Sequence, residues 1–484
     1  MDNNYDTIVI GSGCGGAAAA ALVKYLGHKT LLLEKNRCFG GRASTYEKGG
    51  FKFDHGHIIM RSEKGPHGEV LRIMKRPWLI PRFSHCGSWA MKTIIGDVPV
   101  EYLPNVFRAY LSPRFYRQHA KYGYTVKDML QILHFALVAR FMTEKGFAKI
   151  NYQDLKTFLS KYTDNYYFHL LMGGLASVSF GATMEDASAG ELIRVIQNGL
   201  KDYIYMGYPI NGEGVSAIPN SFVKAASEMG CDIKLNTKVD NIVIENGCAK
   251  GVRINGDTIT AKNVISGIGI KETVLKLVGK EHFSNAYSQK IENLKYSYGG
   301  ISLKYALKKK ITDLCWGGEI PDNLERMSDD MQSGRIPEKF PIMFVTPSNI
   351  DPSLAPEGTQ VMSFISGGPA TVPGDIDWTR WVEHMKTQAE GLFPGLKENV
   401  LYCDVSTPDD IAKFSGRTFG DAVGVSQTVD QVNDRRPSPV SPLKGLFYAG
   451  ADVGRGCCAT ELASESAIAL YQYFKKNTEI FQTR

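Results

Sequence analysis

The sequence lacks the marks of a disulfide framework and of a metal site. Its 484 residues hold nine cysteines, an odd number, with no C-x-x-C pair and no histidines clustered at metal-ligand spacing. Small secreted domains use paired cysteines as cross-links, and structural zinc sites need closely spaced cysteine and histidine ligands. We therefore predict no metal, no disulfide framework and a reducing compartment.

Long hydrophobic runs and an export signal are also missing. The chain begins Met-Asp-Asn-Asn and leads directly into a strand pattern, without the basic and apolar regions of a signal peptide. The longest apolar run, 129–142, is interrupted by Gln131, His134 and Arg140, and it is shorter than the roughly 20 residues that span a bilayer. We expect no transmembrane helix and a cytoplasmic protein, with peripheral attachment to the inner face of the membrane left open.

The strand patterns predict an α/β fold with a parallel sheet. Residues 6–10 form a short apolar strand, followed by a glycine-rich turn, a helix over 17–25 and a second strand over 30–33. Such a βαβ unit opens a nucleotide-binding domain. Further strand patterns, and a closing strand, turn and helix, come much later in the chain, at 232–235, 239–245, 250–254, 263–266 and 445–473.

The glycine-rich turn carries a dinucleotide fingerprint. Gly11, Gly13 and Gly16 form a G-x-G-x-x-G pattern, in which the glycines permit a tight turn, close approach of a diphosphate and close packing of the helix. The diphosphate then lies at a helix N-terminus, where free N–H groups favour anions. Glu34 ends the second strand 18 residues after Gly16, where a carboxylate can accept both ribose hydroxyls and repels the extra phosphate of NADP. The alternative is an ordinary turn with a solvated Glu34.

A family resemblance begins just after Glu34. The segments C-F-G-G-R-A-S-T at 38–45 and F-D-H-G at 53–56 resemble the FAD-dependent amine oxidase and phytoene desaturase superfamily. The resemblance implies that Gly40 and Gly41 bring the backbone close to the flavin, and that Arg42 faces the FAD diphosphate. A guanidinium suits that role because it is permanently charged and makes bidentate contacts with phosphate.

The C-terminal segment strengthens the resemblance. Residues 445–456, G-L-F-Y-A-G-A-D-V-G-R-G, lead into T-E-L-A at 460–463 and are similar to the closing FAD motif of phytoene desaturases, carotenoid isomerases and retinol saturases. The resemblance implies that Asp452 reaches the FAD diphosphate and ribityl region. It also implies that the last helix points its N-terminus at the flavin pyrimidine, where the helix dipole stabilises an anionic reduced flavin. The complete predicted cofactor site is Gly11, Gly13, Gly15, Gly16, Glu34, Lys35, Gly40, Gly41, Arg42, Val239, Gly450, Asp452, Thr460, Glu461 and Leu462.

The resemblance also predicts the domain organisation. The expected fold class is α/β, with a Rossmann-like FAD-binding domain of the GR2 type and an interleaved α+β substrate or cap domain. The discontinuous FAD-binding domain is assigned to 1–80, 210–284 and 421–484, and the substrate or cap domain to 81–209 and 285–420.

The sequence departs from the family pattern in two places. C-C-A at 457–459 replaces the usual Pro-Gly-Val, and His55 and His57 flank a glycine. Two imidazoles beside a flavin can act as acid and base near neutral pH, so His55, His57 and Glu461 are the catalytic candidates. The structural alternative is that a histidine bonds a backbone carbonyl and that the cysteines pack as small hydrophobes.

The segment 101–161 is unusually basic and aromatic. It holds ten lysines and arginines against four acids, so its excess of six positive charges equals the net charge of +6 of the whole chain. It also holds twelve aromatic residues. This composition suits peripheral contact with a membrane surface, but it also suits a buried cap helix with solvated charges. Nucleic-acid binding is not expected, because no recognition module accompanies the charge.

We predict an FAD-dependent oxidoreductase that acts on carbon–carbon bonds of an apolar, unsaturated substrate of isoprenoid, carotenoid or retinoid type, with hydride transfer through flavin N5. The resemblance leaves a desaturase, a double-bond reductase and a redox-neutral isomerase open, since FAD carries the difficult chemistry in each. No second G-x-G-x-x-G supports a nicotinamide site, so the electron donor or acceptor stays undefined.

Two alternatives come from the same superfamily. A flavin amine oxidase more often carries Gly-Glu where this chain has G-A-D at 450–452, and no aromatic cage pair can be assigned from the spacing. A non-catalytic lipid-binding protein similar to GDP dissociation inhibitors has a degraded flavin site, whereas Glu34, Arg42 and the closing motif are all present here.

Overall fold

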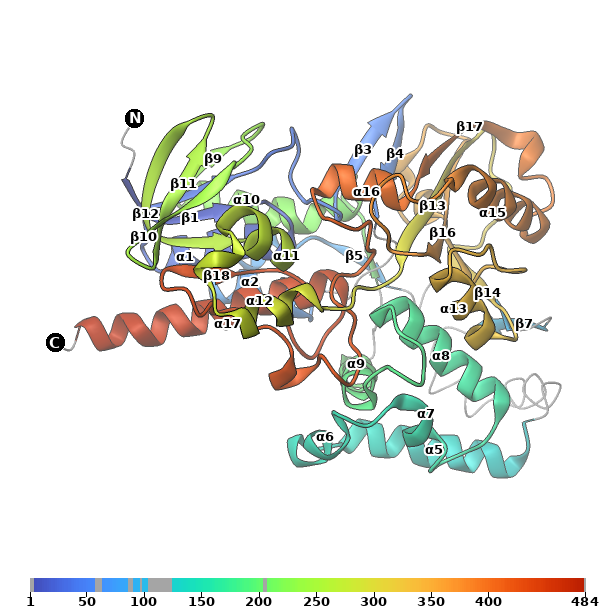
Figure 1. Ribbon diagram of the computed structural model, residues 1–484. Coiled ribbons are helices and arrows are strands. Elements are labelled where there is room, and N and C mark those ends of the chain that lie inside the picture. The colour runs from blue at the N-terminus through green and yellow to red at the C-terminus, as the bar shows by residue number, and fades with distance from the viewer. Residues whose placement is uncertain are drawn as a thin grey trace.

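Two large sheets organise the molecule. The computed structural model describes residues 4–56, 63–85, 90–95, 98–102, 124–202 and 207–482. Within them lie two seven-stranded sheets and a group of helices along one side (Figure 1). The first sheet takes its strands from 4–33, 232–266 and 446–448, and the second from 91–102 and 299–406. The predicted α/β class is confirmed.

The first sheet has a parallel centre built from three distant segments. Its strand order is β10-β11-β12-β1-β2-β9, and β18 pairs with β12. β1, β2, β9, β12 and β18 are parallel, while β10 and β11 form an antiparallel extension. The strands are β1 Asn4–Ile10, β2 Thr30–Leu33, β9 Asp232–Lys234, β10 Asn241–Glu245, β11 Cys248–Ile254, β12 Asp257–Ser266 and β18 Leu446–Tyr448.

β12 begins earlier than the sequence pattern indicates, at Asp257 instead of 263. Asn255 and Gly256 both adopt positive φ, 51° and 90°, which is the backbone of a tight hairpin turn. The turn pairs Ile254 of β11 with Asp257 of β12, and so extends the strand into solvent. In that half, buried Ile259 and Ala261 alternate with exposed polar residues, so it lacks the continuous apolar run of the second half.

Helices cover both faces of the first sheet. The face with Val9, Leu32 and Ile265 packs against α1 (Cys14–Tyr25), α10 (Ala217–Glu228) and α17 (Ala459–Gln482). α1 fits closely because its buried residues 17–21 are all alanine. Alternate strand residues point the other way, and there they meet α12 (Asn285–Glu292) and the helical segment around Val274.

The second sheet has the order β17-β13-β16-β15-β14-β6-β7, and only β14 and β6 pair in parallel. Its strands are β6 Met91–Ile95, β7 Val98–Tyr102, β13 Gly299–Leu307, β14 Trp316–Ile320, β15 Ile342–Val345, β16 Gln360–Gly368 and β17 Val400–Ser406. α13 (Leu324–Gln332) and α15 (Trp378–Leu392) pack on it and close an aromatic core. α16 (Pro408–Ser415) follows β17 and leads back toward the first sheet.

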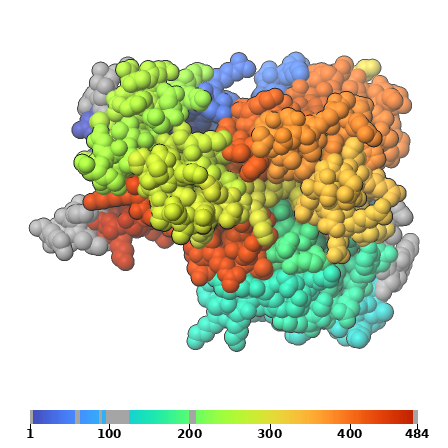
Figure 2. Space-filling view, viewed as in Figure 1, coloured from blue at the N-terminus to red at the C-terminus, as the bar shows by residue number. Residues whose placement is uncertain are grey.

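The helices between 124 and 202 form a lobe of their own along one side of the molecule, teal to green in Figure 2. They are α5 Val126–Phe141, α6 Glu144–Ile150, α7 Leu155–Leu159, α8 Tyr166–Phe180 and α9 Ala189–Asp202. None of the helices in the described part of the chain is long and apolar enough to cross a membrane. The remaining elements are β3 Thr45–Lys48, β4 Phe51–Asp54, α2 Pro66–Ile73, β5 Phe83–His85, β8 Gly207–Pro209, α11 Ile270–Glu272 and α14 Pro347–Ile350.

The strands of the first sheet lie within the ranges predicted for the FAD-binding domain, and those of the second within the ranges predicted for the cap. α12 lies past the predicted boundary at 284, yet its Ile291 belongs to the core of the first sheet. The domain boundaries stay a prediction. Part of the chain that follows residue 284 covers the first sheet.

Candidate cofactor and active site

A cavity of about 810 Å³ lies where the parallel strands of the first sheet end. The loops that follow β1, β2, β12 and β18 line it through Gly11, Glu34, Gly267 and Gly450. Ligands of open α/β sheets bind at this edge. The volume falls within the roughly 300–1,000 Å³ typical of cofactor and ligand sites. The opposite wall comes from residues 372–373 and 412–423.

The glycine fingerprint brings the two ends of the chain together. Gly11 adopts a φ of +87°, which a side chain disfavours. A Cβ on Gly15 would lie 2.6 Å from the Ala449 carbonyl oxygen, and one on Gly16 would lie 2.0 Å from that of Gly11. Glycine at 15 and 16 therefore lets α1 pack directly on β1 and on the chain entering the closing motif.

The N-terminus of α1 is free to hold an anion. Gly13 occupies its N-cap position with no side-chain hydrogen bond, and no acid lies in the first turn. A Cβ on Gly13 would meet only the Gly40 carbonyl, 4.0 Å away, so this part of the cradle stays open. Unpaired N–H groups and the helix dipole favour a phosphate here. The residues thus fit the diphosphate of the predicted FAD.

Glu34 is buried and held by the neighbouring loop. Its Oε2 accepts hydrogen bonds from the Ser12 N–H at 2.8 Å and the Ser12 hydroxyl at 2.6 Å, and Oε1 accepts one from the Asn36 N–H at 2.9 Å. An ionised carboxylate offers about four lone-pair positions. One position is left for a cavity hydroxyl, and contact with both ribose hydroxyls stays a prediction.

Arg42 also lines the cavity, but its guanidinium reaches across to the opposite wall. Nη1 donates to the Asp421 carboxylate at 2.8 Å and to the Asp421 carbonyl at 2.7 Å. Gly40, with a φ of +105°, and Gly41, with +54°, turn the chain so that Arg42 faces inward. Arg42 is therefore a bridge between the two walls as well as a group available to a phosphate.

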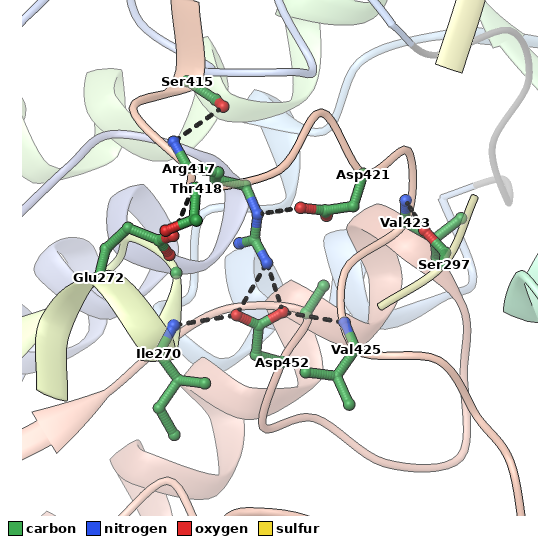
Figure 3. Close-up of polar contacts among 12 residues, drawn as sticks. Ile270, Glu272, Ser297, Ser415, Arg417, Thr418, Asp421, Val423, Val425 and Asp452 are labelled. Atoms are coloured by element: carbon green, nitrogen blue, oxygen red, sulfur yellow. Dashed lines mark hydrogen bonds and ion pairs between the residues drawn. The ribbon is translucent and has the colours of Figure 1, made fainter. Parts of the chain in front are cut away.

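Asp452 is enclosed by hydrogen bonds (Figure 3). It accepts from the Ile270 N–H at 3.0 Å, from the Val425 N–H at 3.1 Å and from Nη2 of Arg417 at 3.0 Å to each oxygen. Burial alone raises the pKa of Asp452, but Arg417 and the backbone donors outweigh it, so the net shift is downward and the carboxylate stays charged. The family resemblance predicts that Asp452 reaches FAD. In the structure, Asp452 also holds the Arg417 side chain in place through two hydrogen bonds.

Arg417 and Asp421 are site residues that the sequence reasoning missed. They lie in the loop after α16, and Arg417 Nε donates to Asp421 Oδ1 at 2.7 Å. Both side chains are almost fully buried. The loop matches no fingerprint, and the only local signal is a basic residue followed four positions later by an acid.

Most of the other predicted cofactor residues line the same cavity, namely Lys35, Val239, Gly450 and Thr460. Gly16, Glu461 and Leu462 are not among its lining residues. Gly16 packs on Gly11 instead. At the N-terminal end of α17, Ala459, Thr460 and Ala463 line the cavity, while Glu461 and Leu462 are buried elsewhere on the helix.

His55 lines a second cavity of about 320 Å³, which shares Arg42, Gly56 and Ala422 with the first. Its ring stacks on Phe414, with centroids 4.3 Å apart, and Nδ1 lies 3.1 Å from the Ser44 hydroxyl and 3.3 Å from the Ser44 carbonyl oxygen. Burial, with a contribution from Lys304, lowers the pKa of His55 to about 4. The ring is therefore neutral at pH 7, in contrast to the near-neutral titration expected from the sequence. His57 lies outside the described residues.

Lys304 is a second group that the sequence reasoning missed. It lies in β13, is 1% exposed, and donates to the Ser406 hydroxyl. Burial lowers its pKa to about 8. A lysine in a strand pattern indicates a solvent-facing position, but here Nζ lies 5.6 Å from the centroid of the Tyr46 ring on β3 and bonds Ser406 on β17.

The paired cysteines pack on opposite sides of the loop before α17. Cys457 belongs to the core of the first sheet, and Cys458 packs against the core of the helical lobe. Ala459, which follows, has a φ of +46°, a strained value for a residue with a side chain. In the described part of the chain no group of three His, Cys, Asp or Glu side chains could hold a metal ion.

Comparison with known proteins agrees with this geometry. The sequence profile of the family described as "Flavin containing amine oxidoreductase" matches residues 15–469. The chain is 25% identical to a 4,4'-diapophytoene desaturase (4,4'-diaponeurosporene-forming) of Staphylococcus haemolyticus, covering 93% of this chain and 94% of that one. It is 26% identical to a chloroplastic prolycopene isomerase of Daucus carota, over 92% of this chain and 76% of the relative.

Solved structures share the fold. An oxidoreductase from Methanosarcina mazei superposes with a TM-score of 0.70 at 17% identity, covering 96% of this chain and 100% of that one. A redesigned putrescine oxidase superposes with a TM-score of 0.68 at 13% identity, covering 98% and 99%. At these identities the likeness concerns the fold.

Proposed function

Because the chain belongs to the family of flavin-containing amine oxidoreductases and is an FAD-dependent oxidoreductase, we propose that it acts on carbon–carbon bonds of an apolar, unsaturated isoprenoid. A carotenoid or retinoid-like substrate fits, with the enzyme working as a desaturase, double-bond reductase or redox-neutral isomerase. The observation that carries the proposal is the likeness over nearly the whole chain to a diapophytoene desaturase and a prolycopene isomerase.

The first cavity would hold FAD through residues from both ends of the chain. The α1 N-terminus and Arg42 would face the diphosphate, Glu34 a ribose, and the first turn of α17 the flavin. When bound, FAD supplies a hydride acceptor or donor at flavin N5. The protein supplies orientation, charge and exclusion of water.

The second cavity would receive the reacting segment of the substrate. Apolar and polar side chains both line it; the apolar residues are Ile301, Ile365, Val405, Ile411 and Phe414, and the polar ones Arg42, Tyr46, His55, Ser302, Asp404, Ser406 and Asp410. Its volume of about 320 Å³ lies at the lower end of the range for ligand sites. It therefore suits part of a long polyene and not the whole molecule.

His55 is placed to take a proton from that segment. Ser44 occupies Nδ1, and Nε2 has no hydrogen-bond partner in the part of the chain that is described. Since a neutral imidazole that donates from Nδ1 can accept at Nε2, we propose His55 as the base in a desaturation, or as the returning acid in the reverse direction. The low pKa makes it a weak base, so orientation has to contribute strongly.

The second cavity weighs against amine oxidation. An amine substrate is cationic and needs an unpaired acceptor or an apolar cage. Asp404 already binds the Tyr46 hydroxyl and, at 2.9 Å, Lys48, and Asp410 accepts from the Thr407 N–H and hydroxyl in the capping box of α16. Asp404 is thus engaged through both oxygens and Asp410 through Oδ2, which leaves less acceptor capacity for an ammonium group.

α5 supports the proposed contact with a membrane surface. Its residues Ile132, Phe135 and Ala139 pack into the core of the helical lobe and Met129 is also buried, whereas the opposite face is exposed and apolar. We name that face the α5 stripe; it consists of Val126, Leu130, Leu133, Leu137 and Phe141. Lys127, Lys145 and Lys149 are exposed on α5 and α6. An exposed apolar stripe beside basic residues suits the surface of an anionic bilayer.

Purified protein tests the proposal in two steps. Its absorbance spectrum, and the nucleotide released by heat, should identify FAD in about equimolar amount. Anaerobic mixing of the reduced enzyme with polyenes, retinoids and unsaturated lipids should then show reoxidation or isomerisation with one class. A colourless protein that does not take up FAD, or a holoenzyme that reacts with amines and with none of these compounds, would overturn the proposal.

A further inference from the structure

The loop after α16 presents a buried guanidinium to the cofactor cavity. Arg417 is held at Nε by Asp421 and at Nη2 by both oxygens of Asp452, as Figure 3 shows. Its side chain is only 9% exposed. Nη1 has no hydrogen-bond partner among the described residues, although Arg417 lines the cavity. Two of its five N–H donors therefore remain available to a ligand.

Glu272 faces the same part of the cavity from the first sheet. It is 4% exposed, its Oε1 accepts the Thr418 N–H, and its buried Oε2 has no hydrogen-bond partner among the residues that the structure describes. The carboxylate does not form an ion pair with Arg417, although both residues are described. A buried carboxylate oxygen without a donor is unfavourable, so a bound group that donates to it would be stabilised.

Gly269 keeps the space between these two side chains open. Its φ of −58° is one that any residue adopts, so the backbone does not require glycine. A Cβ there would lie 1.8 Å from Glu272 Oε2 and 3.0 Å from Arg417 Nη1. A donor and an acceptor thus flank a bare stretch of backbone that also lines the cavity.

We infer that Arg417 and Glu272 bind one phosphate–hydroxyl unit of the dinucleotide across Gly269. The guanidinium donates to a phosphate oxygen, and the carboxylate accepts from the adjacent sugar hydroxyl. Such a unit occurs on both sides of a pyrophosphate, as the ribose phosphate of the adenosine half and as the ribityl phosphate of the flavin half. This inference rests on the proposed FAD site and adds two residues to it that lie outside both fingerprints.

The arrangement gives the cofactor a role in joining the two walls. Arg417 belongs to the loop from the second sheet, and Glu272 to the segment after β12. Asp421 accepts a hydrogen bond from Arg417 and another from Arg42, a residue of the G-G-R segment near the start of the chain. A ligand bound to both Arg417 and Glu272 would therefore hold the α16 loop against the first sheet.

Calorimetric titration of the full-length protein, freed of flavin, with FAD, FMN and ADP tests the inference. Gly269→Ala fills the space and Glu272→Gln removes the acceptor charge, while both leave the bonds of Arg417 to Asp421 and Asp452 in place. Each should weaken FAD binding at least tenfold. Arg417→Lys, which keeps a charge but loses the guanidinium fork, should do the same, and Arg335→Ala, which removes a surface ion pair with Asp330, should leave the affinity unchanged.

The titrations with FMN and ADP show which half of the dinucleotide carries the phosphate–hydroxyl unit. A parallel loss for FMN assigns it to the ribityl phosphate, and a parallel loss for ADP assigns it to the adenosine phosphate; either supports the inference. FAD affinities of Gly269→Ala and Glu272→Gln within twofold of the unmodified protein would overturn it and leave the proposed function intact. Failure of the unmodified protein itself to bind FAD would instead reject the proposed function.

Discussion

Replacing three exposed residues of the α5 stripe by glutamine should release the protein from anionic lipid vesicles. The change is Leu130→Gln, Leu137→Gln and Phe141→Gln in one variant. Glutamine has good helix propensity, and the three side chains lie on the face opposite the buried residues of α5. The helix and its packing should therefore persist while the apolar surface is lost.

The magnitude follows from the exposure of the three side chains. Leu130, Leu137 and Phe141 are 64%, 47% and 70% exposed. Fully burying such a side chain contributes about 1.5–3 kcal/mol, so the part still exposed is worth about 1 kcal/mol for each. The variant should lose roughly 3 kcal/mol of membrane affinity, which corresponds to a decrease on the order of a hundredfold in the partition constant.

Co-sedimentation with vesicles of phosphatidylcholine and phosphatidylglycerol measures this loss. Leu401→Gln is the matched control, because Leu401 is 49% exposed but lies on β17, away from the helical lobe. The control should bind vesicles as the unmodified protein does, and circular dichroism should be the same for all three proteins. If the triple variant sediments with vesicles as well as the control, the α5 stripe does not contact the membrane.

Three further experiments, with four substitutions, probe the cofactor site and its surroundings. Glu34→Ala and Arg42→Ala should each weaken FAD binding by about 1–3 kcal/mol, because buried partners lose their hydrogen bonds. Full FAD occupancy, measured by absorbance, in both variants would show that these residues are not part of the site. His55 with a pKa of about 4 binds protons less readily than an unfolded imidazole, so its contribution to stability falls as the pH drops from about 6.5 to 4. Thermal melts of His55→Phe should accordingly show a weaker dependence on pH in that window, and a slope equal to that of the unmodified protein would argue against the buried neutral ring. Gly15→Ala places a Cβ 2.6 Å from the Ala449 carbonyl oxygen and should lower the free energy of unfolding by about 1–3 kcal/mol. The control is Gly391→Ala in α15, where the new Cβ meets open space. Equal urea midpoints for the two variants would show that the chain ends are not in close contact.

Several features of the site were predictable because they depend on short stretches of chain. The strands β1 and β2 follow from apolar runs bounded by turns. The need for glycine at 11 and 40 follows from backbone angles that a side chain disfavours. The family resemblance predicted FAD and the meeting of the first and last segments, and the cofactor assignment and fold class are confirmed. The individual site residues stay predictions, which the binding experiments address.

Other features arose only when distant segments packed together. Arg42 and Asp421 are 379 positions apart, and Arg417 and Asp452 are 35 apart. No pattern around Arg417 indicates that two carboxylates will enclose it. The same holds for His55, whose pKa depends on burial and on Lys304, a residue of the second sheet.

The sequence by itself thus determined the backbone of the cofactor cradle, because glycine positions and strand periodicity act through local φ, ψ and the alternation of side chains. The tertiary structure decided the charges around that cradle. Burial and charge pairing depend on which side chains from distant segments end up within a few ångströms of one another. The position of Arg417 beside Asp452, and the neutral state of His55, are therefore properties of the folded molecule.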